Sequence, residues 1–489
     1  MSRSLASFAL LMLVVLTLGL PLGAAGQASP VPEADAYGSG DQLSAALPAV
    51  PYNSRFGLAW ISGPEMSQVP ESRYQKALAS GARWNRWVMY WVDHERNPNS
   101  IDWATWDANV IRDHNHGLNV LALLQQTPDW AVNAATGQTD FETLRRYLRP
   151  GLKLEETASA QDVIGLDTRP PRNLDKPVFL PDGRINPENY WGYFVYRTVN
   201  RYKPGGDLAR QQGWGDGWGI RHWEIWNEPN LSMFWGGSVA QYYLLLKVAY
   251  QAAKAADPNA FILWGGIAHA GNTISWSIAL MDEIARDGNR TSQWPYFDAT
   301  NWHWYSQAAA LYDQSRLVQS ELSRRGLGGK QMWVTETNVP AYGDPGAPSH
   351  PSCVGYPYSA NTDEQASYVI QAYANAMAAG VDRVFVHQLQ DDQWGAPYPE
   401  AWGLVRNDES LRPLYAAYQV AAKYFANPQQ VTKVIDNASV ARVTMSGVLL
   451  DGHYHRVTVL WNLTGNQVTA SVAAVAASAQ RIRKDGSSD

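Results

Sequence analysis

The chain of 489 residues is too long for one small core, and its length fits a large domain joined to a smaller one. Its net charge of −6, from 39 basic and 45 acidic residues with no basic run, argues against a nucleic-acid partner. The 22 tryptophans and 25 tyrosines are enough to fill a large aromatic core and still leave some rings for a ligand cleft.

The N-terminal residues have the pattern of a secretory signal. Arg3 supplies a positive charge, an apolar run extends from Phe8 to Leu20, and small residues follow from Gly23 to Ala28. The run is short for a membrane span of about 20 residues, so residues 1–28 are predicted to be cleaved, with a retained signal anchor as the alternative. The protein is expected to be secreted or extracytoplasmic, without a membrane partner after cleavage. Residues 29–50, rich in Ala, Ser, Gly and Pro, are predicted to be a linker.

The chain has one cysteine, Cys353, in a Pro-rich stretch. A secreted protein with one cysteine has no internal disulfide, so its stability must come from burial across a large core. The sequence contains no Cys/His cluster with zinc spacing and no calcium-binding loop motif, and neither a metal nor another cofactor is predicted.

Residues 51–427 alternate short apolar runs with longer amphipathic stretches. Eight such units predict a parallel, closed (β/α)8 TIM barrel. Gly117 and Gly380 directly follow two of the amphipathic stretches, as helix ends often require. The predicted strands are 55–61, 82–90, 118–124, 220–227, 260–266, 296–303, 331–336 and 383–389. The predicted helices are 70–80, 103–116, 188–203, 238–256, 273–287, 309–326, 362–380 and 409–426.

A long connection, residues 132–187, follows the third predicted strand. It contains a potential short helix at 141–149 and several prolines. Loops of this length inside a compact domain are usually either functional or disordered. Because it leaves the face of the barrel that carries active sites, it is interpreted as a wall of the cleft.

Residues 428–489 change character and predict a small C-terminal β domain, interpreted as a β-sandwich that is incomplete or unusually short. Turn signals lie at Asp451-Gly452 and Thr464-Gly465. The predicted strands are 431–435, 441–450, 454–462 and 467–472.

Two glutamates close two separate predicted strands. Glu228 ends the run Trp223-Glu-Ile-Trp-Asn-Glu, and Pro229 stops the strand because it has no backbone N–H. Glu336 ends the run Gln331-Met-Trp-Val-Thr-Glu. Since the C-terminal ends of barrel strands meet at one mouth, the two carboxylates are predicted to lie close together. Such a pair is what cleavage of a glycosidic bond needs.

The octapeptide Trp223-Glu-Ile-Trp-Asn-Glu-Pro-Asn230, which includes Glu228, contains a second glutamate, Glu224. Because side chains alternate along a strand, Glu224, Trp226 and Glu228 are expected on one side of it, with Glu224 deeper in the barrel. A buried carboxylate needs a partner, and Arg86 on a nearby strand is a candidate. Glu224 is therefore predicted to be structural.

These motifs resemble those of the clan A glycoside hydrolases, a large group of retaining (β/α)8-barrel glycosidases, and among them most closely family 39. The resemblance covers about residues 55–426. It is carried by Trp226-Asn-Glu-Pro-Asn230, Gly81-Ala-Arg-Trp-Asn-Arg86, Trp402-Gly-Leu404 and Arg412-Pro-Leu-Tyr415.

The resemblance implies a double displacement on a carbohydrate substrate, with Glu228 as acid/base and Glu336 as nucleophile. Tyr305 would hydrogen-bond the nucleophile, and Asn227 would contact the sugar 2-hydroxyl. His303 matches the His/Tyr position of the clan at the sixth strand end, where a satisfied barrel histidine is the alternative reading. Substrate-binding roles are thus expected for Asn227, Arg86, His303, Tyr305 and Trp394.

The eighth strand departs from the resemblance. In many relatives it ends in a Trp that forms the floor of the subsite for the cleaved sugar, whereas here Arg383-Val-Phe-Val-His-Gln-Leu-Gln-Asp-Asp-Gln precedes Trp394. Either Trp394 folds back as the floor or the subsite is built differently, so no sugar is predicted.

Three functions stay open: a secreted retaining glycoside hydrolase acting on a polysaccharide or oligosaccharide, a transglycosylase, and a non-catalytic carbohydrate-binding barrel. Decayed relatives typically lose one of the two carboxylates, and both are present here, which favours an enzyme. The linkage, endo or exo action and the oligomeric state are not predicted.

Overall fold

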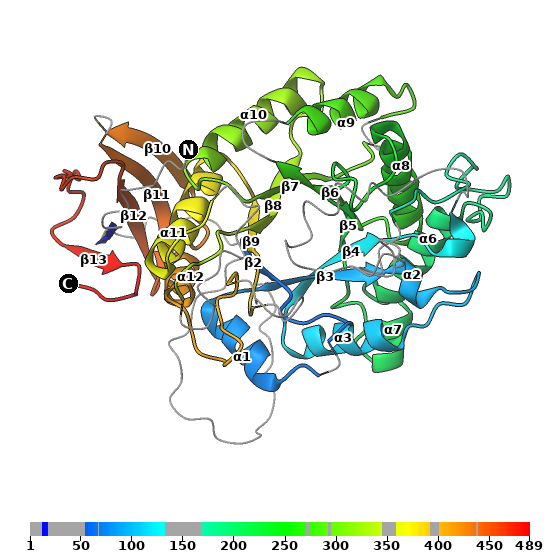
Figure 1. Cartoon of the computed structure of the whole chain (residues 1–489), viewed down its shortest axis with the longest axis horizontal. Coiled ribbons are helices and arrows are strands. Elements are labelled where there is room, and N and C mark those ends of the chain that lie inside the picture. The colour runs from blue at the N-terminus through cyan, green and yellow to red at the C-terminus, as the bar shows by residue number, and fades with distance from the viewer. Residues whose placement is uncertain are drawn as a thin grey trace, which may run out of the picture.

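The computed structural model describes residues 54–66, 68–132, 168–269, 274–291, 295–344, 358–391, 401–436 and 439–489, together with the backbone of residues 12–17. Eight parallel strands close into a barrel in sequence order (Figure 1), which confirms the predicted TIM barrel. The strands are β2 (Phe56–Ala59), β3 (Trp84–Tyr90), β4 (Asn119–Gln125), β5 (His222–Asn227), β6 (Phe261–His269), β7 (Ala299–Trp304), β8 (Gln331–Thr337) and β9 (Arg383–Val386).

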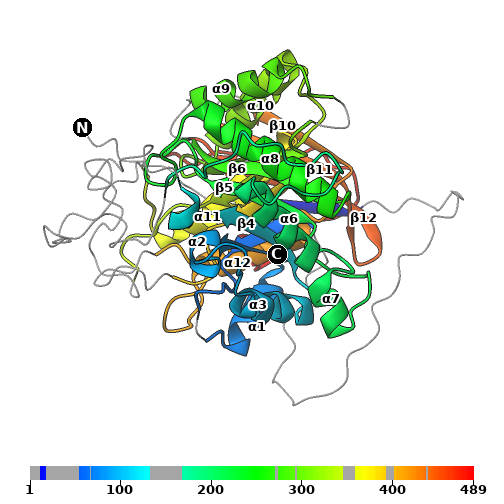
Figure 2. The same ribbon diagram turned by 90° about the vertical axis from the view of Figure 1, so that its right-hand side faces the viewer.

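Eight helices form the outer layer at the predicted places, and Figure 2 shows α8 beside α6 over one side of the barrel. Ser238 and Asn361 begin two of the longest helices, α8 and α11, each with a capping box that satisfies free backbone donors. The eight are α1 (Glu71–Ser80), α3 (Ala104–Asn115), α6 (Tyr190–Tyr202), α8 (Val239–Ala256), α9 (Ser275–Arg286), α10 (Ala310–Arg324), α11 (Thr362–Ala378) and α12 (Pro413–Tyr424). The sequence did not predict the short helices α2 (Trp91–His94), η1 (Asp129–Ala131) and α7 (Asp207–Gln212).

Large aromatic side chains fill part of the barrel interior. Trp84, Trp333 and Phe385 belong to a separate buried cluster, and all three are contributed by barrel strands. Gly57 on β2 makes room for this layer, because a Cβ there would lie 2.3 Å from the Phe385 ring. The interior is therefore a packed core that leaves only the mouth for a ligand.

The C-terminal residues form one antiparallel sheet in the order β10-β11-β12-β1-β13, packed beside α11 (Figure 1). Its buried side chains join the barrel core, so a barrel helix takes the place of the second sheet of a sandwich. The predicted strand at 467–472 is wrong: this segment pairs with no strand and is mostly exposed, and the chain resumes pairing at β13. The strands are β10 (Gln430–Asp436), β11 (Val440–Leu450), β12 (His453–Asn462) and β13 (Ala479–Arg483).

Strand β1 (Met12–Thr17) lies between β12 and β13, inside the segment predicted to be a cleaved signal. Among the strands that the structure describes, β1 alone pairs with β13. Residues 12–17 cannot both be removed and keep this position, so cleavage would leave β13 without its present partner. Among the described residues, no helix has the length and apolar character needed to cross a membrane. Cys353, the proposed helix at 141–149 and most of the predicted cleft wall lie outside the described ranges.

Candidate active site

Arg86, on β3, lies at the centre of the site. Its side chain is fully buried and forms ion pairs with Glu224 of β5 and Glu336 of β8, each with a nitrogen–oxygen distance of 2.6 Å. A second hydrogen bond of 3.1 Å, from Nη2 to Oε1 of Glu224, makes that pair bidentate. Bidentate pairing fixes the plane of a guanidinium, so Glu224 determines how Arg86 meets the other carboxylate.

Of the two carboxylates that bind Arg86, Glu224 is the one with further hydrogen bonds to the barrel itself. Its Oε1 accepts further hydrogen bonds from the Gly266 amide at 2.9 Å and from Asn301 Nδ2 at 2.7 Å. The side chain is fully buried, and a buried charge is tolerated only with such partners. These contacts agree with the predicted partnership between Glu224 and Arg86.

The backbone of β5 breaks the expected alternation just before the strand ends. Trp226 has φ +71° and Glu228 has φ +42°, in the left-handed region that such residues rarely adopt. Trp226 consequently faces the helices: its indole donates to the Phe234 carbonyl at 2.7 Å, and its ring packs edge-on against Trp191 of α6. The expectation that Trp226 shares a side with Glu224 and Glu228 is therefore wrong.

Glu336 is held as a carboxylate. Tyr305 donates a hydrogen bond of 2.5 Å to Oε2, and Arg86 Nη1 donates one of 2.6 Å to Oε1. Burial would raise the pKa of Glu336, but the positive charges of His303, Arg86 and His387, together with the Tyr305 hydroxyl, lower it to about 2. The group is thus ionised over the ordinary pH range, as a nucleophile must be.

His303 connects the two carboxylates at the mouth. Its Nδ1 lies 2.7 Å from Oε1 of Glu228 and 3.5 Å from Oε2 of Glu336, while Arg86 Nη2 faces Nε2 at 3.4 Å. Because a guanidinium only donates, it is Nδ1 that carries a proton toward Glu228. Burial alone would lower the pKa of His303, but the charges of Glu336 and Glu228 outweigh it and raise the pKa.

One oxygen of Glu228, one of Glu336 and a ring nitrogen of His303 all lie within 4.8 Å of one another, close enough to bind a cation. Both oxygens of Glu336 already accept hydrogen bonds from Arg86 and Tyr305, and Nδ1 of His303 faces Glu228. The arrangement therefore fits two carboxylates held in place by hydrogen bonds better than a metal centre.

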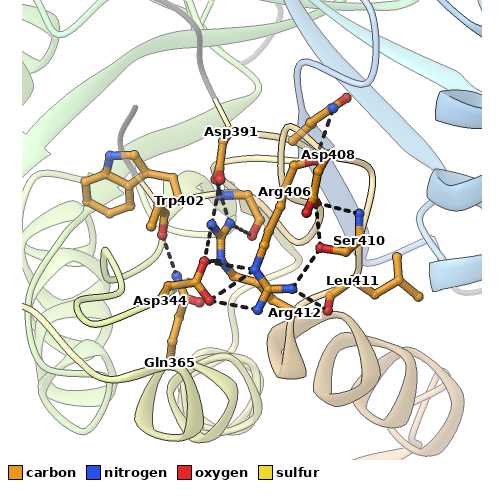
Figure 3. A network of polar contacts seen from close by, with 12 residues as sticks. Asp344, Gln365, Asp391, Trp402, Arg406, Asp408, Ser410, Leu411 and Arg412 are labelled. Carbon is orange, nitrogen blue, oxygen red and sulfur yellow. Dashed lines mark hydrogen bonds and ion pairs between the residues drawn. The ribbon is translucent and has the colours of Figure 1, made fainter. Parts of the chain in front are cut away.

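A buried ion-pair network holds the loops that follow β8 and β9 (Figure 3). Arg412 Nη2 lies 2.9 Å from Asp344 and 2.6 Å from Asp391, and Arg406 is a second cation 2.7 Å from Asp344. Arg412 Nη1 also donates to the Gly403 carbonyl at 2.8 Å. Two cations face two carboxylates, so the network is neutral and fixes both loops to the start of α12.

The loops held by this network carry a ring that packs beside the site. Asn338 Nδ2 donates to the carbonyls of Trp402, at 2.6 Å, and His387, at 2.8 Å. The Trp402 ring then crosses that of Tyr305 at a centroid distance of 5.2 Å. The buried Trp402 indole thus packs against the ring of Tyr305, whose hydroxyl binds Glu336.

The structure brings together most of the residues that the sequence singled out. Trp394 lies outside the described part of the chain, so its predicted position is not tested. Sequence reasoning missed Trp60 and assigned His387 a structural role; their rings cross at a centroid distance of 5.5 Å beside the site. Their position directly after the first and eighth barrel strands was the available signal. Among the described residues, those of the site are Arg86, Asn227, Glu228, His303, Tyr305 and Glu336.

Comparisons with known proteins agree with the fold expected from the motifs. Similar solved structures include a glucosidase from Croceicoccus marinus, 15% identical with a TM-score of 0.52 over 82% of this chain and 77% of that one. A family 39 glycoside hydrolase, the β-xylosidase of Caulobacter crescentus, is 18% identical with a TM-score of 0.51 over 82% and 79% of the two chains. A family 39 enzyme from Xanthomonas axonopodis pv. citri is 14% identical with a TM-score of 0.51 over 87% and 76%.

Similarity in sequence is narrower. A β-xylosidase from Geobacillus stearothermophilus is 29% identical over 106 residues, which are 21% of this chain and 19% of that protein. This chain thus matches about a fifth of the length of that curated relative. No family model matches the chain. The similarity to these solved structures, among them family 39 enzymes, confirms the (β/α)8 barrel fold that the resemblance implied.

Gly266→Ala is expected to displace His303, because a Cβ at position 266 would lie 2.0 Å from Nε2 of that ring. Overpacking of this kind typically costs about 1–3 kcal/mol, so the melting temperature should fall. Gly288→Ala is the matched control, since nothing lies within 4 Å of a Cβ there. Thermal unfolding of both variants checks this; equal melting temperatures would contradict the close approach.

Proposed function

We propose that the protein is a retaining glycoside hydrolase that cleaves O-glycosidic bonds of a polysaccharide or oligosaccharide by double displacement. The observation that supports this best is the pair Glu228 and Glu336, with an oxygen of each within 4.8 Å. Retaining enzymes hold their carboxyl groups about 5–5.5 Å apart, whereas inverting enzymes leave about 6.5–9.5 Å for a water.

In the first step Glu336 attacks the anomeric carbon as a carboxylate. Glu228 donates a proton to the departing oxygen, so the glycosidic bond breaks as the glycosyl–enzyme ester forms. His303 Nδ1 donates to Oε1 of Glu228 and leaves Oε2 to carry the transferred proton. Arg86 hydrogen-bonds Asn227 Oδ1 at 3.1 Å, which turns the amide NH2 toward the ligand side, where it can donate to the sugar 2-hydroxyl.

In the second step Glu228, now ionised, takes a proton from water, and the resulting hydroxide attacks the anomeric carbon. Glu336 leaves as a carboxylate and the sugar departs with its original configuration. A transglycosylase would differ only in using a sugar hydroxyl in place of water. A non-catalytic binder would not need the two carboxylates in such different surroundings.

Glu336→Ala is expected to lower kcat by at least about a thousandfold, because the nucleophile is lost. Added azide should then restore turnover and give a glycosyl azide of inverted configuration, visible by NMR.

Glu228→Ala should retain the first step only on aryl glycosides with good leaving groups. If Glu228→Ala cleaved alkyl and aryl glycosides with the efficiency of the wild type, the acid/base assignment would be wrong.

Tyr305→Phe is expected to shift the acid limb of kcat/KM to higher pH. The Tyr305 hydroxyl stabilises the ionised form of Glu336, so its removal raises the pKa of that carboxyl from about 2. Activity should therefore be lost at a higher pH as the solution is acidified, with the neutral plateau less affected. An acid limb at the wild-type pH would show that the phenol does not help to keep Glu336 charged.

We also propose that the protein is secreted and that residues 1–28 are removed. Expression of the full chain in a host with a secretory pathway should yield extracellular protein whose N-terminal sequence begins near residue 29. Intact-mass measurement and N-terminal sequencing check this. Protein that keeps residues 12–17 would favour β1 as a permanent strand of the C-terminal sheet.

A further inference from the structure

We infer that His387 is a substrate-contacting residue, which hydrogen-bonds an oxygen substituent of the sugar bound next to Glu336. This inference rests on the proposed glycosidase function and specifies how its subsite recognises the sugar. It assigns a polar contact to the end of the eighth barrel strand, where the resemblance to clan A led us to expect an indole.

The backbone of His387 is fixed against the residues that follow the nucleophile. Its amide donates to the Thr337 carbonyl at 3.2 Å, and its own carbonyl accepts from Asn338 Nδ2 at 2.8 Å. Thr337 and Asn338 come directly after Glu336 in the chain. The position of the imidazole is therefore linked to that of the reacting carboxylate.

The imidazole is partly exposed and surrounded by aromatic rings. The rings of Trp60, Tyr305 and Trp402 lie 5.5, 6.1 and 5.9 Å from it, at interplanar angles of 86°, 87° and 71°. None of them stacks face to face with the imidazole, and aromatic edges offer its nitrogens no acceptor oxygen. The ring is thus positioned by packing and keeps its polar capacity for another molecule.

The Nδ1 atom of His387 is buried and has no hydrogen-bond partner within the described part of the chain. Buried polar groups in folded proteins almost always have a partner, so an unpaired one beside a catalytic pair points to a ligand or a displaceable water. The positive charge of this ring also contributes to the low pKa of Glu336, which places the imidazole electrostatically close to that carboxylate.

A sugar can supply the missing hydrogen-bond partner of His387 with a hydroxyl or a carboxylate. Both accept a hydrogen bond from an imidazole N–H, and a uronate would add charge attraction to a protonated ring. Xylosides, glucosides and glucuronides differ only in the substituent at C5, so a series with one common aryl leaving group separates a ring hydroxyl from an exocyclic oxygen.

The first test compares His387→Phe with the wild type on the best aryl glycoside of that series. Phe keeps the ring packing and removes the nitrogens, so kcat/KM should fall about tenfold to a hundredfold. His387→Asn, which keeps an N–H close to the position of Nδ1, should recover a large part of the loss. His453→Phe, on the exposed face of β12, is the control and should match the wild type.

The second test removes the partner atom from the substrate. With monodeoxy analogues of the best glycoside, one deoxygenation should cost the wild type about tenfold or more and cost His387→Phe nothing further, since contacting groups are non-additive. Equal penalties in both proteins at every position would overturn the contact and leave His387 a packing residue. If His387→Phe is unstable, the same comparison with His387→Leu, which also lacks the ring nitrogens, decides the matter.

Failure of this inference differs from failure of the proposed function. A folded wild-type protein that turns over no glycoside would overturn the proposed function and the contact with it. An active wild type with unchanged kcat/KM in His387→Phe would overturn the contact alone.

Discussion

The site depends on one buried cation. Arg86 has no exposed surface and lies between Glu224 and Glu336, so each carboxylate compensates a charge that would otherwise be expensive to bury. Removing one member of such a group leaves an unpaired charge and typically costs about 3–5 kcal/mol. The fold therefore has a strong energetic reason to bring β3, β5 and β8 together at these residues, independent of any substrate.

The sequence predicted the barrel well because the information is local. Each strand is a short apolar run, each helix an amphipathic stretch, and a repeated alternation of the two has few other solutions. The same reasoning failed at 467–472, where a β-like composition has no neighbouring strand to pair with. It also could not foresee β1, because the pairing of residues 12–17 with β12 and β13 spans almost the whole chain.

For the site, strand ends were predictable and their fine geometry was not. Glu228 and Glu336 could be found because a strand that runs into Asn-Glu-Pro or Thr-Glu-Thr ends in polar residues at the mouth. The positive φ of Trp226 could not be read from the sequence, since Trp has no preference for that region and only the surrounding packing enforces it. The network of Asp344, Asp391 and Arg412 was equally hidden, because its members come from two separate connections and are far apart in the sequence.

The proposed reaction cycle gives a physical reason for the presence of two glutamates in one octapeptide. When Glu336 becomes an ester its negative charge disappears, and Arg86 would be left as an unpaired buried cation if Glu336 were its only partner. Glu224 keeps its bidentate contact with Arg86 and its hydrogen bonds to Gly266 and Asn301, none of which involves the reacting atoms. The intermediate therefore retains a neutral Arg86–Glu224 pair, and the free energy needed to form it is lower than it would be with a single carboxylate. In the proposed mechanism Glu224 thus supports turnover without touching the substrate, because it balances the charge of Arg86 while the charge of Glu336 is absent.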